Sequence, residues 1–541
     1  ANDGKLSKQL PEGTPFALVG SSSFYKRETY PNGSVPEKGT TAIFAGKNDP
    51  WKGLDAFTSH GNGTALNWHN QGADAGLYEN SDIHAVRILA MEPTTDRKGA
   101  NSGRRYFNHA GERLRILGEI PLRKFGSSPG TAVPGLDPDG NPDTSFLAKI
   151  PADLGFTFQT IDKHGMVLNM SQTWHQLRPG EIRNDCGGCH AHSQKPTEFR
   201  LTLAAKDDYK VWDLVNTTPI VSDAIRDESK KKWDVEGKSG LRFAQGALNV
   251  EYWRDVKPIL NRSCVECHSS KEGKEPAGKL DLDADAEMIQ AEHLGKFPGT
   301  YYRLAMDFAG RFGHKPLVGG WKAPNASRYV RMFQSRRSLL VWKIFGQRLD
   351  GWNNDDFPTE SEPGNARTLK LKGETVTDTL VNRNRADLDF TGSIMPPPDA
   401  VKSGKVAPLS DEDRLTIVRW IDLGCPIELD PKYGWMLDDQ RPTLTVTSPQ
   451  VGANPPLSKI LIGMYDYVGL DPKSFEVIAD FAIHGVAAAT NLASQFKETS
   501  PGVWEMILKE PIRTKRGVLK VSVKDKAGNV TRIDRVFAAG L

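Results

Sequence analysis

Cysteine, long apolar runs and an excess of charge of either sign are all scarce in this sequence. Its 541 residues include 70 Lys or Arg and 67 Asp or Glu, so the formal net charge is only +3. Proteins that neutralise a phosphate backbone need a surplus of basic residues, which excludes nucleic-acid binding as the default function. No apolar run approaches the roughly 20 residues of a bilayer-spanning helix, so we expect no membrane span.

Four of the five cysteines lie in two copies of one pattern, Cys-x-x-Cys-His. This pattern is the attachment signature of c-type haem, in which two thiols bind the porphyrin and the histidine binds the iron. The sequence therefore predicts two covalently bound haem c groups. Their predicted attachment residues are Cys186, Cys189 and His190 for the first haem, and Cys264, Cys267 and His268 for the second. A single four-thiolate zinc site is the alternative, but it leaves both histidines unexplained.

Covalent haem is attached outside the cytoplasm, so the two motifs predict a periplasmic or extracellular protein. On this interpretation the polar start at Ala1 is what remains after removal of a signal peptide. A soluble cytochrome of this kind also needs a redox partner protein that donates or accepts electrons.

The first part of the chain, residues 1–245, has the pattern of a β-rich domain that carries the first haem. Short apolar runs alternate with clusters of Gly, Pro, Asn and Asp, as is typical of strands and turns. The predicted strands are residues 83–89, 114–120, 146–150, 156–161 and 166–170. No helix is expected ahead of Cys186, so loops should surround the first haem.

Residues 246–440 have the order of parts of a class I cytochrome c. Residues 250–260 show helical spacing and lead into Cys264, and a Met-Pro-Pro-Pro segment follows far downstream at Met395. Ser410 then predicts the N-cap of a helix that ends at Gly424. We interpret residues of about 285–385 as a long insertion, partly helical around 329–345.

Residues 441–541 predict an immunoglobulin-like β-sandwich, because short strands recur at regular spacing. The candidate strands are residues 444–447, 460–464, 475–481, 503–508 and 518–523, with a turn at 525–529. The predicted fold class is therefore multidomain α+β: a β-rich haem domain, a helical cytochrome c-like domain and a terminal sandwich.

Met395 is the predicted sixth ligand of the second iron, because a thioether is a soft ligand that raises the potential. The alternative is that Met395 only packs and that His293 or His314 binds the iron instead. With either ligand the iron has no open position, and the second haem should transfer electrons.

The first iron has two candidate partners besides His190, namely His175 and His192, which we take as the candidate catalytic residues. His175 is a distal ligand, a base in the pocket or a structural side chain. His192 binds a neighbouring metal or a haem propionate, or is an ordinary loop histidine. If no strong ligand fills the sixth position, this haem can bind a small molecule.

Two further features of the sequence are candidates for a functional role. The loop Asp137-Pro-Asp139-Gly-Asn141-Pro-Asp143 places side-chain oxygens at alternate positions, as a calcium loop does, although a plain Asx-rich turn has the same residues. Cys425 follows the predicted helix end and is expected to be a small buried residue, with a reactive thiol as the alternative.

Three segments of the chain resemble the diheme part of the hydrazine synthase α subunit and related multidomain cytochromes c of planctomycete type. They are residues 150–159, 173–181 and 186–194, and residues 338–352 and the Met-Pro-Pro segment look like the same group. The resemblance implies a catalytic first haem in a β-rich domain and an electron-transferring second haem.

The resemblance also implies features that this sequence does not share. In that family a Tyr binds the catalytic iron, and the motif His turns to a zinc ion with help from a Cys. Residues 191–199 contain no Tyr, and no Cys precedes Cys186 in this sequence. We therefore expect the shared architecture without hydrazine chemistry: a secreted diheme cytochrome whose first haem acts on a small nitrogen, sulfur or oxygen species. The alternatives are a pure electron carrier and a structural subunit of a larger redox complex.

Overall fold

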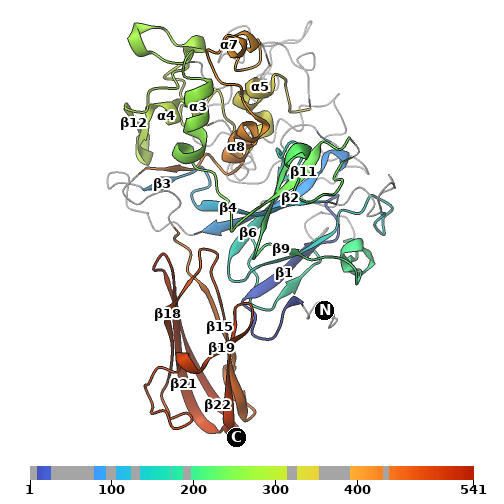
Figure 1. Cartoon of the computed structure of the whole chain (residues 1–541), viewed down its shortest axis with the longest axis vertical. Coiled ribbons are helices and arrows are strands. Elements are labelled where there is room, and N and C mark those ends of the chain that lie inside the picture. Colours follow the sequence, from blue (N-terminus) through green and yellow to red (C-terminus); the bar gives the residue numbers. More distant parts are fainter. Residues whose placement is uncertain are drawn as a thin grey trace, which may run out of the picture.

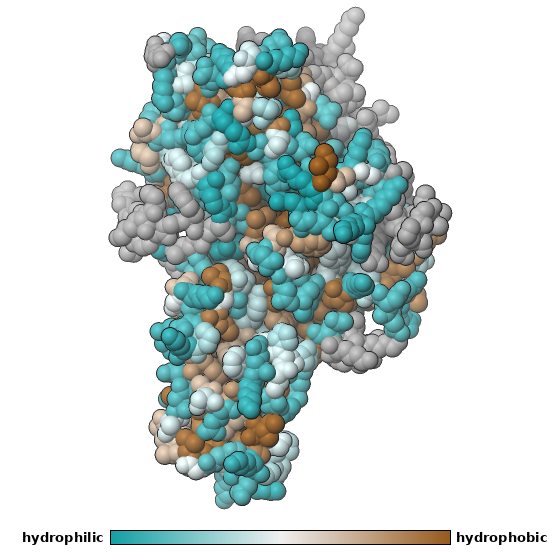
Figure 2. All heavy atoms as spheres, viewed as in Figure 1, coloured by the Kyte–Doolittle hydropathy of each residue, from teal (hydrophilic) through white to brown (hydrophobic). Residues whose placement is uncertain are grey.

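The computed structural model describes residues 9–25, 78, 80–92, 105–122, 135–171, 174–186, 196–234, 236–313, 326–351, 390, 392–429 and 438–540. These residues form a mostly β, multidomain molecule with three tiers along its long axis (Figure 1). Short helices lie at one end, two β-sheets lie in the middle, and a β-sandwich lies at the other end. The face seen in Figure 2 is mostly hydrophilic, with hydrophobic side chains in small separate groups.

The middle tier consists of two four-stranded sheets. The first has the spatial order β8 (Ile182–Arg183), β1 (Phe16–Ser21), β5 (Phe146–Pro151) and β9 (Trp212–Asp213). The second, the central sheet, has the order β4 (Arg113–Pro121), β2 (Ala85–Glu92), β6 (Gly155–Ile161) and β7 (Val167–Met170). Apolar side chains from both sheets form one buried core between them.

The central sheet is covered on both faces, which explains why β2 and β4 are buried almost along their full length. Successive side chains of a strand point to opposite faces. Val86 and Ile88 of β2 therefore face the first sheet, whereas Ala85 and Leu89 belong to the core beneath the helices.

The helical tier packs on the other face of the central sheet. Its helices are the π-helix η6 (Tyr252–Val256) and the α-helices α3 (Lys257–Ser263), α4 (Gly299–Ala305), α5 (Leu339–Phe345), α7 (Pro398–Lys402) and α8 (Asp411–Asp422). Three two-stranded sheets accompany them: β12 (Met288–Ala291) with β13 (Gly295–Pro298), β14 (Ile427–Glu428) with β3 (Tyr106–Phe107), and β10 (Thr218–Asp223) with β11 (Ser239–Ala244). The 3-10 turns are η2 (Asn80–Asp82), η3 (Phe199–Leu201), η4 (Leu203–Ala205), η5 (Ala224–Arg226), η7 (Lys271–Gly273), η8 (Ala277–Lys279), η9 (Glu292–Leu294), η10 (Ser335–Arg337) and η13 (Ala493–Gln495).

The third tier is a sandwich of two four-stranded sheets around a separate core. One sheet has the order β15 (Thr443–Ser448), β17 (Leu457–Tyr465), β20 (Val503–Ile512) and β19 (Lys497–Ser500). The other has the order β16 (Gly452–Asn454), β22 (Val530–Ala539), β21 (Thr514–Asp525) and β18 (Leu470–Ala479). The Tyr465 ring packs edge-on against Phe16, and its hydroxyl donates to the Val215 carbonyl over 3.0 Å. The sandwich thus docks on the first sheet.

The predicted strands agree closely with β2, β4, β5, β6 and β7, and with β15, β17, β18, β20 and β21. Ahead of Cys186 the described residues contain 3-10 turns and no α-helix, as expected. Residues 246–440 are less helical than the prediction implies, because among the α-helices in the described part of this stretch only α8 exceeds seven residues. None of the helices in the described part of the chain has the length and apolar character that a bilayer crossing requires.

One hydrophobic core joins parts that the sequence assigns to different domains. It extends from Leu89 of the central sheet to Tyr252 of η6 and Ile417 of α8. Tyr301 and Val341, from the stretch interpreted as an insertion, are fully buried in the same core. The boundary predicted at 245/246 therefore crosses continuous packing, and the division into domains stays a prediction.

Candidate haem-binding sites

The second Cys-x-x-Cys-His motif forms a compact turn directly after α3. The amide of Cys264 donates to the Leu260 carbonyl over 2.9 Å and so ends the helix. The amides of Cys267 and His268 both lie 3.1 Å from the Cys264 carbonyl. The turn brings the two thiols and the imidazole together, all half-buried.

The imidazole of His268 is held by a backbone carbonyl. Its Nδ1 lies 3.3 Å from the carbonyl oxygen of Leu280, to which it donates when it carries the proton. Burial lowers the pKa of His268, which favours the neutral ring. Histidines that bind metals commonly fix one ring nitrogen in this way and present the other to the metal. The arrangement fits a ligand that presents Nε2 to iron.

The Cys264 thiol of this motif is not poised for disulfide chemistry. Burial, reinforced by the nearby Cys267, raises the pKa of Cys264 to about 11. Reactive redox cysteines instead have lowered pKa values. The raised pKa of the half-buried Cys264 thiol fits a thioether-forming role better than a catalytic one.

The first turn of α8 is attached to the end of α3 that precedes the motif. Arg262 forms an ion pair with Asp413, and the Ala407 amide donates to the Arg262 carbonyl over 3.0 Å. The same turn of α8 contacts α5, because Nε of Arg414 donates to the Ile344 carbonyl over 3.0 Å. Helix α8 therefore fixes α3 and α5 relative to each other (Figure 1).

Met395 lies in the segment that runs along the end of α5. Its amide donates to the Lys343 carbonyl over 2.8 Å, and Ile394 packs close to Gly346. Met395 is half-buried, whereas the alternative ligand His293 is exposed in the turn between β12 and β13. The other alternative, His314, lies outside the described residues.

The first motif begins where the first sheet ends. Strand β8 pairs in parallel with β1, Leu18 opposite Ile182, and the chain then reaches Cys186, which is half-buried. Cys189, His190 and His192 lie outside the described residues, so their predicted roles stay predictions.

His175 lies on the edge of the central sheet. Its amide and carbonyl exchange two hydrogen bonds with Phe156, each 2.8 Å long, and its ring packs against Phe156 and Phe158. The segment from His175 to Cys186 then crosses to the first sheet, where Gly180 donates to the Phe16 carbonyl over 2.8 Å. One continuous segment thus connects the candidate catalytic histidine with the first attachment cysteine.

The loop of residues 137–143 has the hydrogen bonds of an Asx-rich turn. Oδ1 of Asp137 accepts from the amides of Asp139 and Asn141, and Oδ1 of Asp143 accepts from the amide of Ser145. These carboxylate oxygens are used within the loop, and calcium there stays a prediction. Cys425 is fully buried, which confirms the expected packing role.

The sequence analysis did not identify the partner of the His268 ring. The Leu280 carbonyl belongs to the main chain and carries no signal in the sequence. Side chains that lie between the tiers, such as Arg87 and Asp422, were also missed, because a lone charge in a strand or helix resembles an exposed residue.

Comparisons with known proteins found partial similarity to the hydrazine synthase alpha subunit. Residues 81–191, which contain His175, Cys186, Cys189 and His190, match the family described as "Hydrazine synthase alpha subunit middle domain". Hydrazine synthase subunit alpha of Kuenenia stuttgartiensis is 24% identical over 381 residues. That alignment covers 63% of this chain and 38% of the relative, so the chain spans well under half of the relative's length.

Solved structures give weaker likenesses. Kuenenia stuttgartiensis hydrazine synthase has a TM-score of 0.40 at 16% identity, covering 78% of this chain and 44% of that one. CopC from Methylosinus trichosporium OB3b has a TM-score of 0.13 at 12% identity, covering 17% of this chain and 84% of its own.

Proposed function

We propose that this protein is a periplasmic or extracellular diheme c-type cytochrome. In this proposal the second haem transfers electrons, and the first haem acts on a small inorganic nitrogen, sulfur or oxygen species. The finer fold features, a cytochrome c-like helical part and an immunoglobulin-like sandwich, belong to the same proposal. A redox protein partner supplies or removes the electrons.

The observation that carries the proposal is the turn at the second motif. Cys264 and Cys267 leave α3 on one compact turn, and the Leu280 carbonyl orients the His268 ring next to them. A bound haem c supplies reversible one-electron chemistry at this position. Cys264 and Cys267 would hold it, and His268 and Met395 would bind its iron.

The catalytic part of the proposal is supported by the segment around the first motif. The family whose model matches residues 81–191 is named for a synthase of hydrazine, an inorganic nitrogen compound. The candidate histidine, His175, lies on the same continuous segment as Cys186 and rests against two aromatic rings. With His192 it is our candidate for moving protons at the first haem.

A spectroscopic experiment separates the enzyme from a pure electron carrier. For the enzyme, the EPR spectrum of the oxidised protein should contain one high-spin and one low-spin haem, and the reduced protein should bind carbon monoxide. Two low-spin signals without carbon monoxide binding would contradict the catalytic role and leave electron transfer as the sole proposed function.

Substitution of His175 tests its role in the same spectrum. If His175 binds the first iron, His175→Ala converts a low-spin first haem to high spin. If it acts as a base in the pocket, the spin state is unchanged and turnover falls. His164→Ala, in the turn before β7, is the matched control and should alter neither readout. An unchanged spectrum and unchanged turnover in His175→Ala would remove His175 from the site.

A structural subunit is the second candidate, because the curated relative is itself named as a subunit. The mass of the native protein, measured after purification from its source organism, tests this candidate. A larger assembly supports this candidate, and a strict monomer contradicts it.

A further inference from the structure

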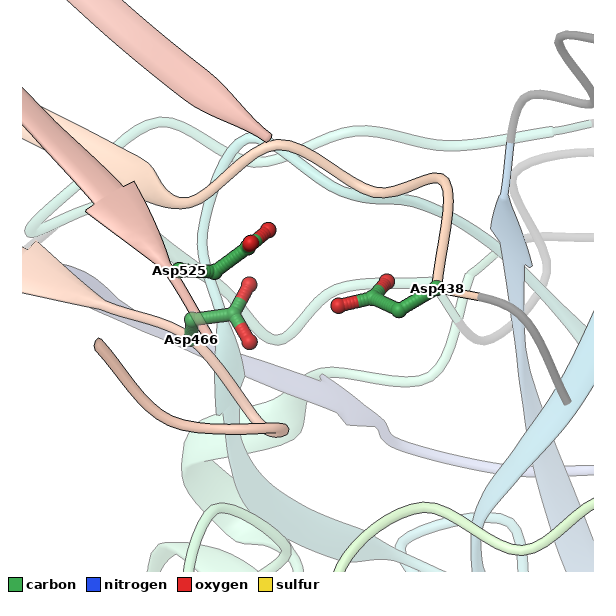
Figure 3. Close-up of side chains that lie close together, drawn as sticks. All are labelled: Asp438, Asp466 and Asp525. Atoms are coloured by element: carbon green, nitrogen blue, oxygen red, sulfur yellow. The ribbon is translucent and has the colours of Figure 1, made fainter. Parts of the chain in front are cut away.

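Three aspartates from separate segments meet at the end of the sandwich that faces the rest of the molecule (Figure 3). Asp438 lies in the segment that leads into β15, Asp466 follows β17, and Asp525 ends β21. A carboxylate oxygen from each lies within 4.8 Å of the other two. All three residues are more than nine-tenths buried, with exposed fractions of 6%, 7% and 2%.

One oxygen of each carboxylate is held by donors of the protein. Oδ1 of Asp438 accepts from the Gln440 amide over 3.0 Å and from the Tyr467 hydroxyl over 3.2 Å. Oδ1 of Asp466 accepts from the amide of Val468, and Oδ1 of Asp525 from the amide of Asn529. These bonds orient the carboxylates toward one another.

The other oxygen atoms of the three carboxylates, which we call the centre, have too few hydrogen-bond donors among the described residues. Oδ2 of Asp438 and Oδ2 of Asp466 are buried and have no hydrogen-bond partner in the part of the chain that the structure describes. Oδ2 of Asp525 accepts from the side chain of Asn529 over 2.8 Å. A buried carboxylate oxygen without a partner is costly, because it has lost its hydration.

The nearby positive charge does not balance three carboxylates. Arg115 of β4 attracts Asp438, but it also pairs with the buried Glu92 and stacks over the Tyr467 ring. Among the residues that the structure describes, the centre therefore has too few cations of its own.

We propose that Asp438, Asp466 and Asp525 bind a calcium ion through the converging carboxylate oxygens. Calcium prefers hard oxygen ligands and accepts the irregular, carboxylate-rich geometry found here. Magnesium requires nearly ideal octahedral geometry and retains several waters, which suits a closed pocket less well. The ion joins the segment before β15 to the ends of β17 and β21, and so fixes the sandwich at its junction with the central sheet.

The test uses the full haem-loaded chain after treatment with a chelator. Calorimetric titration with calcium chloride should give one site per chain at these aspartates, and the melting temperature should rise with calcium. Magnesium chloride should bind at least tenfold more weakly. Because calcium binding is measured directly on the unmodified protein, the test does not depend on any variant folding.

The variant Asp466→Asn tests whether calcium binds at these three aspartates, and Asp534→Asn is the matched control. Asp534 is exposed on β22 of the same sandwich, so its substitution removes one charge without touching the centre. Asp466→Asn should weaken calcium binding at least tenfold and raise the melting temperature of the calcium-free protein, since it relieves repulsion between buried carboxylates. Asp534→Asn should leave both unchanged.

Two results would overturn the proposal. One is the absence of calcium binding to the chelator-treated protein, with a melting temperature that does not depend on calcium. The other is calcium binding that Asp466→Asn leaves intact, which would place the ion elsewhere, for example in the loop of residues 137–143.

Discussion

Arg87 and Glu119 of the central sheet meet Arg419 and Asp422 of α8 inside the molecule. Nε of Arg87 lies 2.8 Å from Glu119, and Arg419 lies 3.0 Å from the other oxygen of the same carboxylate. Every side chain in this group is at most 2% exposed. The group therefore connects the sheet to the helical tier through fully desolvated charges.

Glu119→Gln tests what this group contributes. The substitution leaves two buried guanidinium groups without their shared counter-charge, which typically costs about 3–5 kcal/mol. We expect a correspondingly lower free energy of unfolding in chemical denaturation. Glu236→Gln is the control, because Glu236 pairs with Lys163 on the surface and both side chains are about half exposed. Equal denaturation midpoints for the two variants would contradict the structural role of Glu119.

The same carboxylate predicts a pH dependence. Burial raises the pKa of Glu119, but Arg419 and Arg87 outweigh it and lower the pKa from 4.5 to about 2. When the pKa of a carboxyl is lower in the folded than in the unfolded protein, its charge stabilises the folded protein fully at a pH above the unfolded-state pKa. This stabilisation is lost as the pH falls through the folded-state pKa. The stability difference between the wild type and Glu119→Gln should therefore shrink between pH 4.5 and pH 2. A difference that stays constant over this range would show that Glu119 is not ionised in the folded protein.

Among the elements, α8 has the clearest link between sequence and position. Ser410 and Asp413 form a reciprocal capping box, in which the Ser410 amide donates to Asp413 over 2.8 Å and the Asp413 amide donates to the Ser410 hydroxyl over 3.2 Å. The helix ends before Gly424, whose φ of 85° suits glycine. The first turn of this helix holds both α3 and α5.

Ser410→Ala should destabilise the protein by about 1 kcal/mol, because an N-cap side chain is lost. Ser410→Asn keeps an acceptor of similar capping strength and should restore most of the loss. Thermal or denaturant unfolding of the three proteins measures the effect. An Asn variant no better than the Ala variant would indicate that the hydroxyl contributes through packing and not through the cap.

The sequence predicted helices and strands well where the spacing of apolar residues follows a single helical or strand periodicity. Alternation along β6 and helical spacing with a polar cap at α8 are local signals, and both elements appear within two residues of their predicted bounds. Strand β1 and the hairpin of β10 and β11 were missed, because their sequences carry no clear alternation. The Cys-x-x-Cys-His motifs are equally local, so Cys264, Cys267 and His268 could be proposed from the sequence as attachment residues, and these roles stay predictions.

What joins these elements could not be predicted, because it depends on contacts distant in sequence. Asp422 is separated from Arg87 by 335 residues, and no periodicity connects them. The same holds for the aspartates of the sandwich junction. Met395 could be proposed from the Met-Pro-Pro pattern, but its position beside α5 required the fold.

At the scale of the whole molecule, the three tiers are joined by buried contacts. The helical tier shares a core with the central sheet, and the sandwich docks through Tyr465 and through the Thr443 hydroxyl, which donates to the Ala152 carbonyl over 2.7 Å. This arrangement holds Cys186, at the edge of the first sheet, and the second Cys-x-x-Cys-His motif, among the helices, on one body.

The central claim is that two haem groups are covalently attached to this chain. Its most direct test is the mass of the denatured protein after washing with acidified acetone, which removes haem that is not covalently bound. The account predicts the polypeptide mass plus two haems, a loss of one haem in the Cys264→Ala/Cys267→Ala variant, and no loss in Cys425→Ala. A wild-type mass equal to that of the polypeptide alone would contradict it.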